Sequence, residues 1–137
     1  MNRAPRRTLP EKLRLGQEIV RGYVRARRAL RGGDVRGALT VLRDRRLPRD
    51  EVEPIPVDAA IRLGRAVSRA FVVLPPGSRC LMQSLVLVSM MARRGTSGTL
   101  IIGVRPGERF GAHAWVELDG RPLLAPGGTQ FARLVEL

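Results

Sequence analysis

The segment from Arg79 to Arg94 constrains the fold more than any other part of the chain. Its apolar residues spread almost all the way round a helix: Leu81, Leu85, Val86, Leu87, Val88, Met90 and Met91. A helix without a polar face has to be covered on all sides by other elements. We therefore expect it to be the central buried helix, with Ser78 as its N-cap and Gly95 at its end.

Three amphipathic segments precede it, with apolar residues at three- and four-residue spacing, and they predict helices at about Pro10–Leu30, Val35–Arg43 and Val57–Val73. The first has a T-x-x-E capping box at Thr8 and Glu11. A charged, proline-bearing connector, DRRLPRDEVEPIP, separates the second from the third. We expect it to divide a basic helical region, residues 1–50, from a core at residues 51–137.

After Gly95 the apolar period changes from about 3.6 residues to 2, which indicates strands. Strands are expected at Thr99–Val104, Phe110–Leu118 and Arg121–Ala125, with a last short strand or turn in FARLVEL. Asp119–Gly120 is a strong signal for a two-residue hairpin turn. The chain is therefore predicted to be α+β: helices first, then a small antiparallel sheet packed on the central helix.

The net charge of +13 is uneven, because residues 1–50 carry fifteen Lys and Arg against five acids. Such a region attracts anionic partners, although arginine-rich codon usage explains the excess equally well. Aromatic residues for base stacking do not alternate with the basic ones, so we expect no nucleic-acid partner. We expect no secretory signal at the charged N-terminus, which has no apolar run, and the central apolar run is too short for a bilayer.

Cys80 is the only cysteine, and it stands where a loop becomes the central helix. One cysteine excludes an internal disulfide and fits a reducing cytoplasm, where we expect the protein to be located. At the second helical position its sulfur meets unpaired backbone N–H groups and the positive end of the helix dipole, both of which favour the reactive thiolate. Taken alone, a free cysteine is more often a small buried core residue.

His113 is the only histidine, and on its predicted strand it alternates with Trp115 and Glu117 on one face. A lone strand histidine is usually structural. A single cysteine at a helix N-terminus followed by a single histidine in the next sheet, however, is the arrangement of a nucleophile and its general base. Trp115 is expected to pack in the sheet core or, less favourably, to line a cleft.

The stretches SRCLMQSLVLVSMMARRG, TLIIGV and FGAHAWVELDGRPLL resemble the transglutaminase-like cysteine peptidases, and more closely the lasso-peptide leader peptidases. The resemblance covers roughly Val57–Leu137. It implies a thiol peptidase, without metal or cofactor, that removes the leader from a ribosomally made precursor peptide. A separate small leader-binding protein would present the precursor, and a lasso cyclase would act on the freed N-terminus. The basic region would dock an acidic face of the partner or leader, or simply be a solvated helix face.

The resemblance also implies an acid that orients the histidine, about twelve residues after it, where this chain has Ala125. Asp119 is the substitute that the family pattern suggests. Glu117 lies four residues along the strand, roughly 13 Å from the histidine, and Asp119 lies farther. Neither can touch the ring of His113 if the strand is extended. A backbone carbonyl or the Thr129–Gln130 loop would be other substitutes.

Three other functions stay open at this point. An acyl transferase of the transglutaminase type would use the same Cys80–His113 pair and pass the thioester to an amine instead of water. A basic binding protein would keep both residues for structure only. A peptidase fold retained as a scaffold would explain the missing acid at Ala125.

Overall fold

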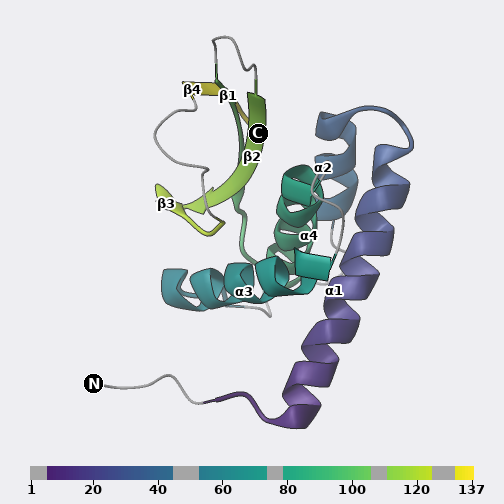
Figure 1. The fold of residues 1–137 in the computed structure, drawn as a ribbon, viewed down its shortest axis with the longest axis vertical. Coiled ribbons are helices and arrows are strands. Elements are labelled where there is room, and N and C mark those ends of the chain that lie inside the picture. The colour runs from purple at the N-terminus through teal and green to yellow at the C-terminus, as the bar shows by residue number, and fades with distance from the viewer. Residues whose placement is uncertain (1–5, 45–52, 74–78, 106–110, 125–131) are drawn as a thin grey trace.

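The computed structural model describes residues 6–44, 53–73, 79–105, 111–124 and 132–137. It contains helices α1 (Leu9–Leu30), α2 (Val35–Arg43), α3 (Val57–Ala70) and α4 (Arg79–Arg93), and a 3-10 turn η2 (Phe71–Val73). Strands β1 (Thr99–Arg105), β2 (Gly111–Leu118), β3 (Arg121–Pro122) and β4 (Ala132–Glu136) form one sheet. The expected α+β fold is confirmed, with the four helices on one side of the sheet (Figure 1).

Helix α4 is the centre of the fold, as its lack of a polar face predicts. It packs against α1, α2 and α3 on one side and against β1 and β2 on the other (Figure 1). Its middle residues, Leu85, Val86 and Leu87, are fully buried. Even Ser84 is buried, and its hydroxyl donates a hydrogen bond to the carbonyl oxygen of Cys80 at 2.8 Å. The helix therefore joins the helical layer and the sheet into one hydrophobic core.

The predicted caps fix the first two helices. The carboxylate of Glu11 accepts a hydrogen bond from the backbone N–H of Thr8 at 2.7 Å, which is the capping box expected at the start of α1. Asp34 accepts from the backbone N–H groups of Arg36 and Gly37 at 3.1 and 3.2 Å and so begins α2. Capping satisfies backbone donors that a helix start otherwise leaves without partners.

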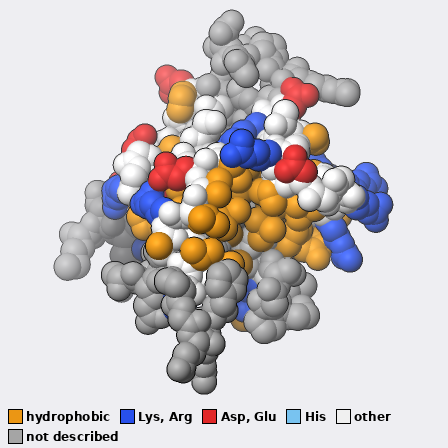
Figure 2. All heavy atoms as spheres, turned by 90° about the horizontal axis from the view of Figure 1, so that it is seen from above, with side chains coloured by type: hydrophobic (Ala, Val, Ile, Leu, Met, Phe, Trp, Pro, Cys, Tyr) orange, Lys and Arg blue, Asp and Glu red, His pale blue; other side chains and the backbone are white. Residues whose placement is uncertain are grey.

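The sheet is antiparallel, in the order β3-β2-β1-β4. Asp119 and Gly120 turn β2 into β3 with φ of 51° and 75°, the left-handed pair that a type I′ hairpin requires. In the β1–β4 pairing the register shifts between Ile102 and Gly103, so β4 carries one extra residue, Leu134. Figure 2 shows the molecule from above: apolar side chains lie in the middle of the surface facing the viewer, with charged side chains of both signs around them.

Two predicted elements end earlier in the structure than the sequence suggested. The third helix is α-helical only to Ala70 and continues as the 3-10 turn η2. The third strand pairs only at Arg121 and Pro122, instead of reaching Ala125. Leu123 still donates its N–H to the carbonyl oxygen of Val116 at 2.8 Å, and beyond this bond the chain leaves the ladder. Leu123 and Leu124 are buried in the core, where the backbone of Leu123 lies against Gly64 of α3. Packing against a helix therefore replaces strand pairing at this edge.

The predicted division at residue 50 falls among residues 45–52, which lie outside the described ranges, and it stays a prediction. Residues on both sides of it pack in the same core, including Ile19, Leu39 and Leu42 from the N-terminal part. Arg43 of α2 also reaches the sheet, where its guanidinium donates to the carbonyl oxygens of Gly98 and Leu137 at 2.8 and 3.0 Å. Within the described ranges no helix is both long enough and apolar enough to cross a membrane.

Candidate active site

Cys80 is the second residue of α4, where the sequence predicts it. Its side chain is half-buried at the edge of the core, so the thiol is neither sealed in the interior nor fully in solvent. The first turn of a helix presents backbone N–H groups without intrahelical partners, together with the positive end of the dipole. The predicted cap Ser78 lies outside the described residues. This position suits the oxyanion that forms when a thiol beside it attacks a carbonyl group.

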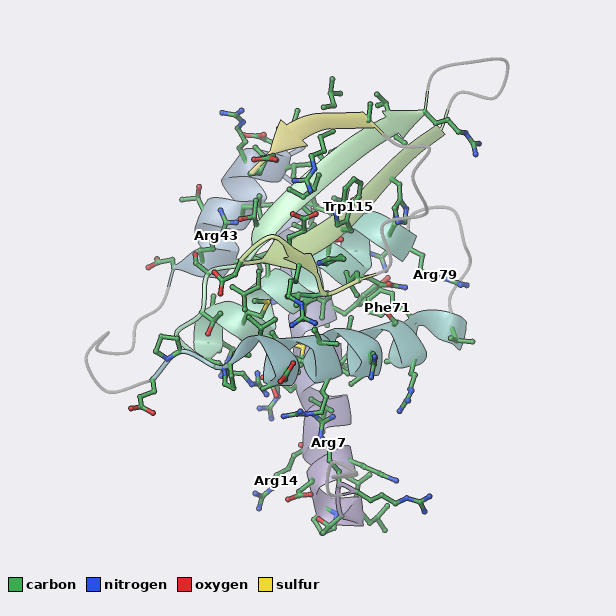
Figure 3. All side chains as sticks on the ribbon, turned by 90° about the vertical axis from the view of Figure 1, so that its left-hand side faces the viewer. Arg7, Arg14, Arg43, Phe71, Arg79 and Trp115 are labelled. Carbon is green, nitrogen blue, oxygen red and sulfur yellow. The ribbon has the colours of Figure 1, made fainter. Side chains whose placement is uncertain are left out.

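His113 lies on β2 opposite Gly103 of β1, and its side chain is half-buried. Its ring stacks on the indole of Trp115, with the ring centroids 6.0 Å apart and the planes at 23°. Trp115 itself is only 4% exposed, so the expectation that it packs in the sheet core is confirmed. Figure 3 shows Trp115 on the side of the molecule where Phe71 and Arg79 also lie. The imidazole therefore rests against a fixed aromatic wall.

The structure brings the two elements together, because α4 packs against β2. Within the described part of the chain no hydrogen bond joins Sγ of Cys80 to the imidazole of His113. Contact between α4 and β2 does not by itself place the thiol beside the imidazole, because His113 lies on the opposite face of β2 from Val116, whose side chain lies near Met91 of α4. The catalytic pairing of Cys80 with His113 therefore stays a prediction. Asp119 lies in the exposed β2–β3 turn, at the opposite end of β2 from His113. Ala125 and Thr129–Gln130 lie outside the described ranges, so the third member of a triad stays a prediction too.

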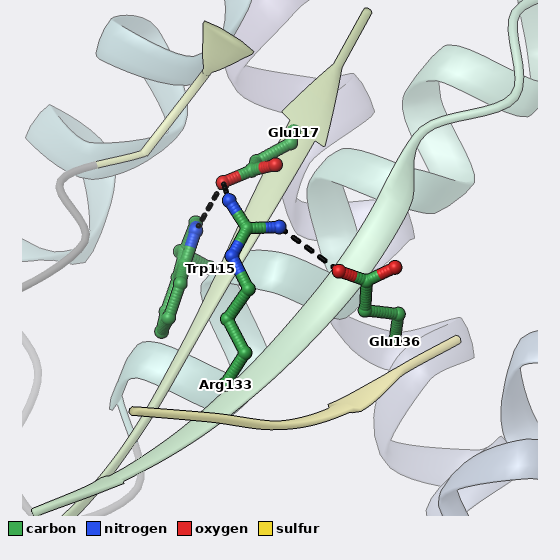
Figure 4. Close-up of polar contacts among 4 residues, drawn as sticks. All are labelled: Trp115, Glu117, Arg133 and Glu136. Atoms are coloured by element: carbon green, nitrogen blue, oxygen red, sulfur yellow. Dashed lines mark hydrogen bonds and ion pairs between the residues drawn. The ribbon is translucent and has the colours of Figure 1, made fainter. Parts of the chain in front are cut away.

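The sequence analysis missed a polar network that includes Trp115 and Glu117, on the face of the sheet that also carries His113 (Figure 4). Glu117 is only 7% exposed, and its carboxylate accepts hydrogen bonds from Nε1 of Trp115 at 3.0 Å and from Arg133 at 2.7 Å. Arg133 also donates to Glu136 at 3.0 Å. The hydrogen bond to Glu136, followed by the charge of Glu117, raises the pKa of Arg133. The buried carboxylate is thereby paired, as a buried charge has to be.

The bulge in β4 explains why this network could not be read from the sequence. In a regular strand, Arg133 and Glu136 would point to opposite faces, because they are three residues apart. The extra residue Leu134 shifts the register, so Arg133 pairs with Gly103 and Glu136 with Ile101, which share one face. Gly103 has no side chain, which leaves room for Arg133 to reach across β1 to Glu117. No residue type signals this bulge.

We expect Glu117→Ala to lower the free energy of unfolding by about 1–3 kcal/mol, because it leaves the buried indole N–H of Trp115 without an acceptor. Glu136→Ala is the matched control. It removes the exposed acid from the same arginine and should cost less than about 1 kcal/mol. Urea unfolding of both variants measures the difference. Equal losses would show that the indole hydrogen bond contributes nothing to stability.

Comparison with known proteins gives one match. The family model described as the transglutaminase-like superfamily matches residues 19–136, which includes the second half of α1, helices α2, α3 and α4, and strands β1 to β4. No curated protein and no solved structure matches the chain.

Proposed function

Because the chain belongs to the transglutaminase-like superfamily, we propose that it is a cysteine peptidase that removes the leader from a lasso-peptide precursor. The observation that carries the proposal is the place of Cys80, the chain's only cysteine, in the first turn of the central helix. The packing of that helix against the strand of His113, the chain's only histidine, supports it. The lasso precursor as substrate rests on the resemblance of the C-L-M-Q-S-L and H-A-W-V-E stretches.

In this reaction His113 takes the thiol proton of Cys80, and the thiolate attacks the carbonyl carbon of the peptide bond that joins leader and core. Backbone N–H groups at the start of α4 stabilise the oxyanion. The tetrahedral intermediate collapses, His113 gives its proton to the leaving amine, and the core departs with a free N-terminus. Water then attacks the thioester, His113 accepts a proton from it, and the leader leaves as a carboxylic acid while the thiol is restored.

The Trp115–Glu117 pair supplies a way to hold His113 in place. Glu117 fixes the indole through the hydrogen bond to Nε1, and the imidazole stacks on the fixed indole. Glu117 thus acts on His113 through Trp115, as a positioning residue. This arrangement does not need a carboxylate in contact with the ring, although the family pattern suggests Asp119 for that part.

The proposal includes two protein partners: a small leader-binding protein that presents the precursor, and a lasso cyclase that takes over the freed core. To test it, a lasso precursor is incubated with this protein, with and without the leader-binding protein, and leader release is followed by chromatography. We expect release with both proteins present and much slower release without the partner. A precursor that stays intact with both proteins present and folded would contradict the proposed function.

A further inference from the structure

An open groove of about 790 Å³ lies between the start of α1 and the outer face of α3. Its basic side chains come from both walls: Arg6, Arg7 and Lys12 from the N-terminal side, and Arg62, Arg65 and Arg69 from α3. Leu15, Ile19 and Ala66 add apolar surface between them. Figure 3 shows Arg7 beside the lower part of α1, at the end of the molecule away from the sheet.

The groove has one sign of charge. Among the described residues no acid lines it, and none of its six cations forms an ion pair with an acid. The second basic depression, on the other side of α1, differs because Glu18 lines it beside Arg14, Arg21 and Arg25. The face in Figure 2 also carries both signs. Like charges in a concave surface repel one another, and a bound anion would reduce this repulsion.

The groove also combines a part of the chain that matches the family with a part that does not. The family match begins at Ile19, so the N-terminal wall precedes the matched region, whereas the α3 wall lies inside it. The capping box at Thr8 and Glu11 holds the start of α1 helical, so Lys12 and Leu15 of this wall stand on an ordered helix, with Arg6 and Arg7 just before it. The groove is therefore built partly from residues that precede the family match.

We propose that this groove binds an acidic segment of the peptide substrate, away from the bond that is cut. Arginine matches carboxylates through paired hydrogen bonds, and Arg62, Arg65 and Arg69 follow one face of α3 at three- and four-residue spacing. The half-buried side chains of Leu15 and Ala66 would contact aliphatic side chains between the carboxylates. The volume suits a few residues of peptide. No aromatic side chain from the described part of the chain lines the groove for base stacking, which disfavours nucleic acid.

This proposal rests on the proposed function for the source of the peptide, so binding and cleavage are tested separately. The binding arm uses the Cys80→Ala protein, which cannot cut, and a fluorescein-labelled peptide of alternating glutamate and leucine pairs at physiological salt. The groove variant is Arg62→Gln with Arg65→Gln and Arg69→Gln. The matched control is Arg14→Gln with Arg21→Gln and Arg28→Gln, which removes three exposed cations from the other side of α1.

We expect the groove variant to weaken binding of the labelled peptide at least about tenfold and the control variant less than about threefold. The twin probe with glutamine in place of glutamate should bind neither protein tightly. Equal losses in both variants would overturn the proposal, because they would show attraction to net charge alone. A single-stranded oligonucleotide that displaces the acidic peptide through Arg62, Arg65 and Arg69 would overturn it as well.

The cleavage experiment tests whether the acidic segment that the groove binds belongs to the peptide substrate. The groove variant, with Cys80 intact, should raise KM for a full-length precursor with an acidic leader and leave kcat unchanged. It should not change cleavage of a short peptide that spans only the cut bond. An unchanged KM for the precursor would contradict the proposal that the groove binds the peptide substrate. A wild-type protein that binds the probe but cuts neither peptide would refute the proposed function and this source, while the binding result stands by itself.

Discussion

Replacing Cys80 with alanine is expected to lower the rate of leader release at least about 10³-fold while the fold stays intact. Without the sulfur no thioester forms, and no other cysteine is present in the chain to replace it. The side chain is half-buried at the edge of the core, so losing one sulfur atom removes little packing. Single-turnover cleavage of a precursor measures the rate, and far-UV circular dichroism with urea unfolding checks the fold.

The partner residue sharpens this test. His113→Ala should cause a comparable loss, and the double variant should be no slower than Cys80→Ala, because the two groups act as a unit. Glu117→Gln should lower kcat much less and shift its pH profile, since it acts on His113 only through Trp115. A folded Cys80→Ala protein that still cuts would contradict the mechanism. Losses in Cys80→Ala and His113→Ala that simply multiply would show that the two do not act together.

Among alanine substitutions of the described glycines, Gly64→Ala is expected to lower the free energy of unfolding most, by more than about 3 kcal/mol. A Cβ at Gly64 would lie 2.2 Å from the carbonyl oxygen of Leu123. That oxygen is a backbone atom and cannot rotate away as a side chain could. Leu123 is also held in place because its backbone N–H donates a hydrogen bond to the carbonyl oxygen of Val116 at 2.8 Å. The contact can be relieved only if α3 moves away from the end of β3, which opens the core around Leu63 and Val67.

Gly16→Ala in α1 is the matched control. It makes the same change in a helix interior, but no heavy atom lies within 4 Å of the new Cβ. It should stabilise the protein by about 0.5–1 kcal/mol through helix propensity alone. Urea unfolding of both variants decides the matter. If Gly64→Ala were as stable as Gly16→Ala, the packing of α3 on Leu123 would be wrong.

The helices could be predicted because their signals are local. Amphipathic spacing, the capping box at Thr8, the cap at Asp34 and the all-round apolar character of α4 each act within a few residues. The hairpin at Asp119–Gly120 is equally local, since the turn type needs residues that tolerate positive φ. From these signals the order of elements and the central place of α4 follow directly.

Features that depend on packing between distant segments could not be predicted. The third strand ends at Pro122 because Leu123 and Leu124 bury their side chains near α3, and an alternating pattern cannot show this choice. The Glu117–Arg133 pair depends on an extra residue in β4. The basic groove depends on how α1 and α3 lie against each other. In the candidate site, the helix start at Cys80 was predictable, whereas the support of His113 by Trp115 and Glu117 was not.

Mass spectrometry of the products tests the central claim most directly. A precursor is incubated with the leader-binding protein and with either the wild-type chain or Cys80→Ala, in the presence of a primary amine. We predict, for the wild type only, a free leader acid and a free core whose masses together equal the precursor plus one water. A leader joined to the amine would instead show an acyl transferase. Cleavage that persists with folded Cys80→Ala, or an intact precursor with the wild type, would contradict a cysteine peptidase built on Cys80 and His113.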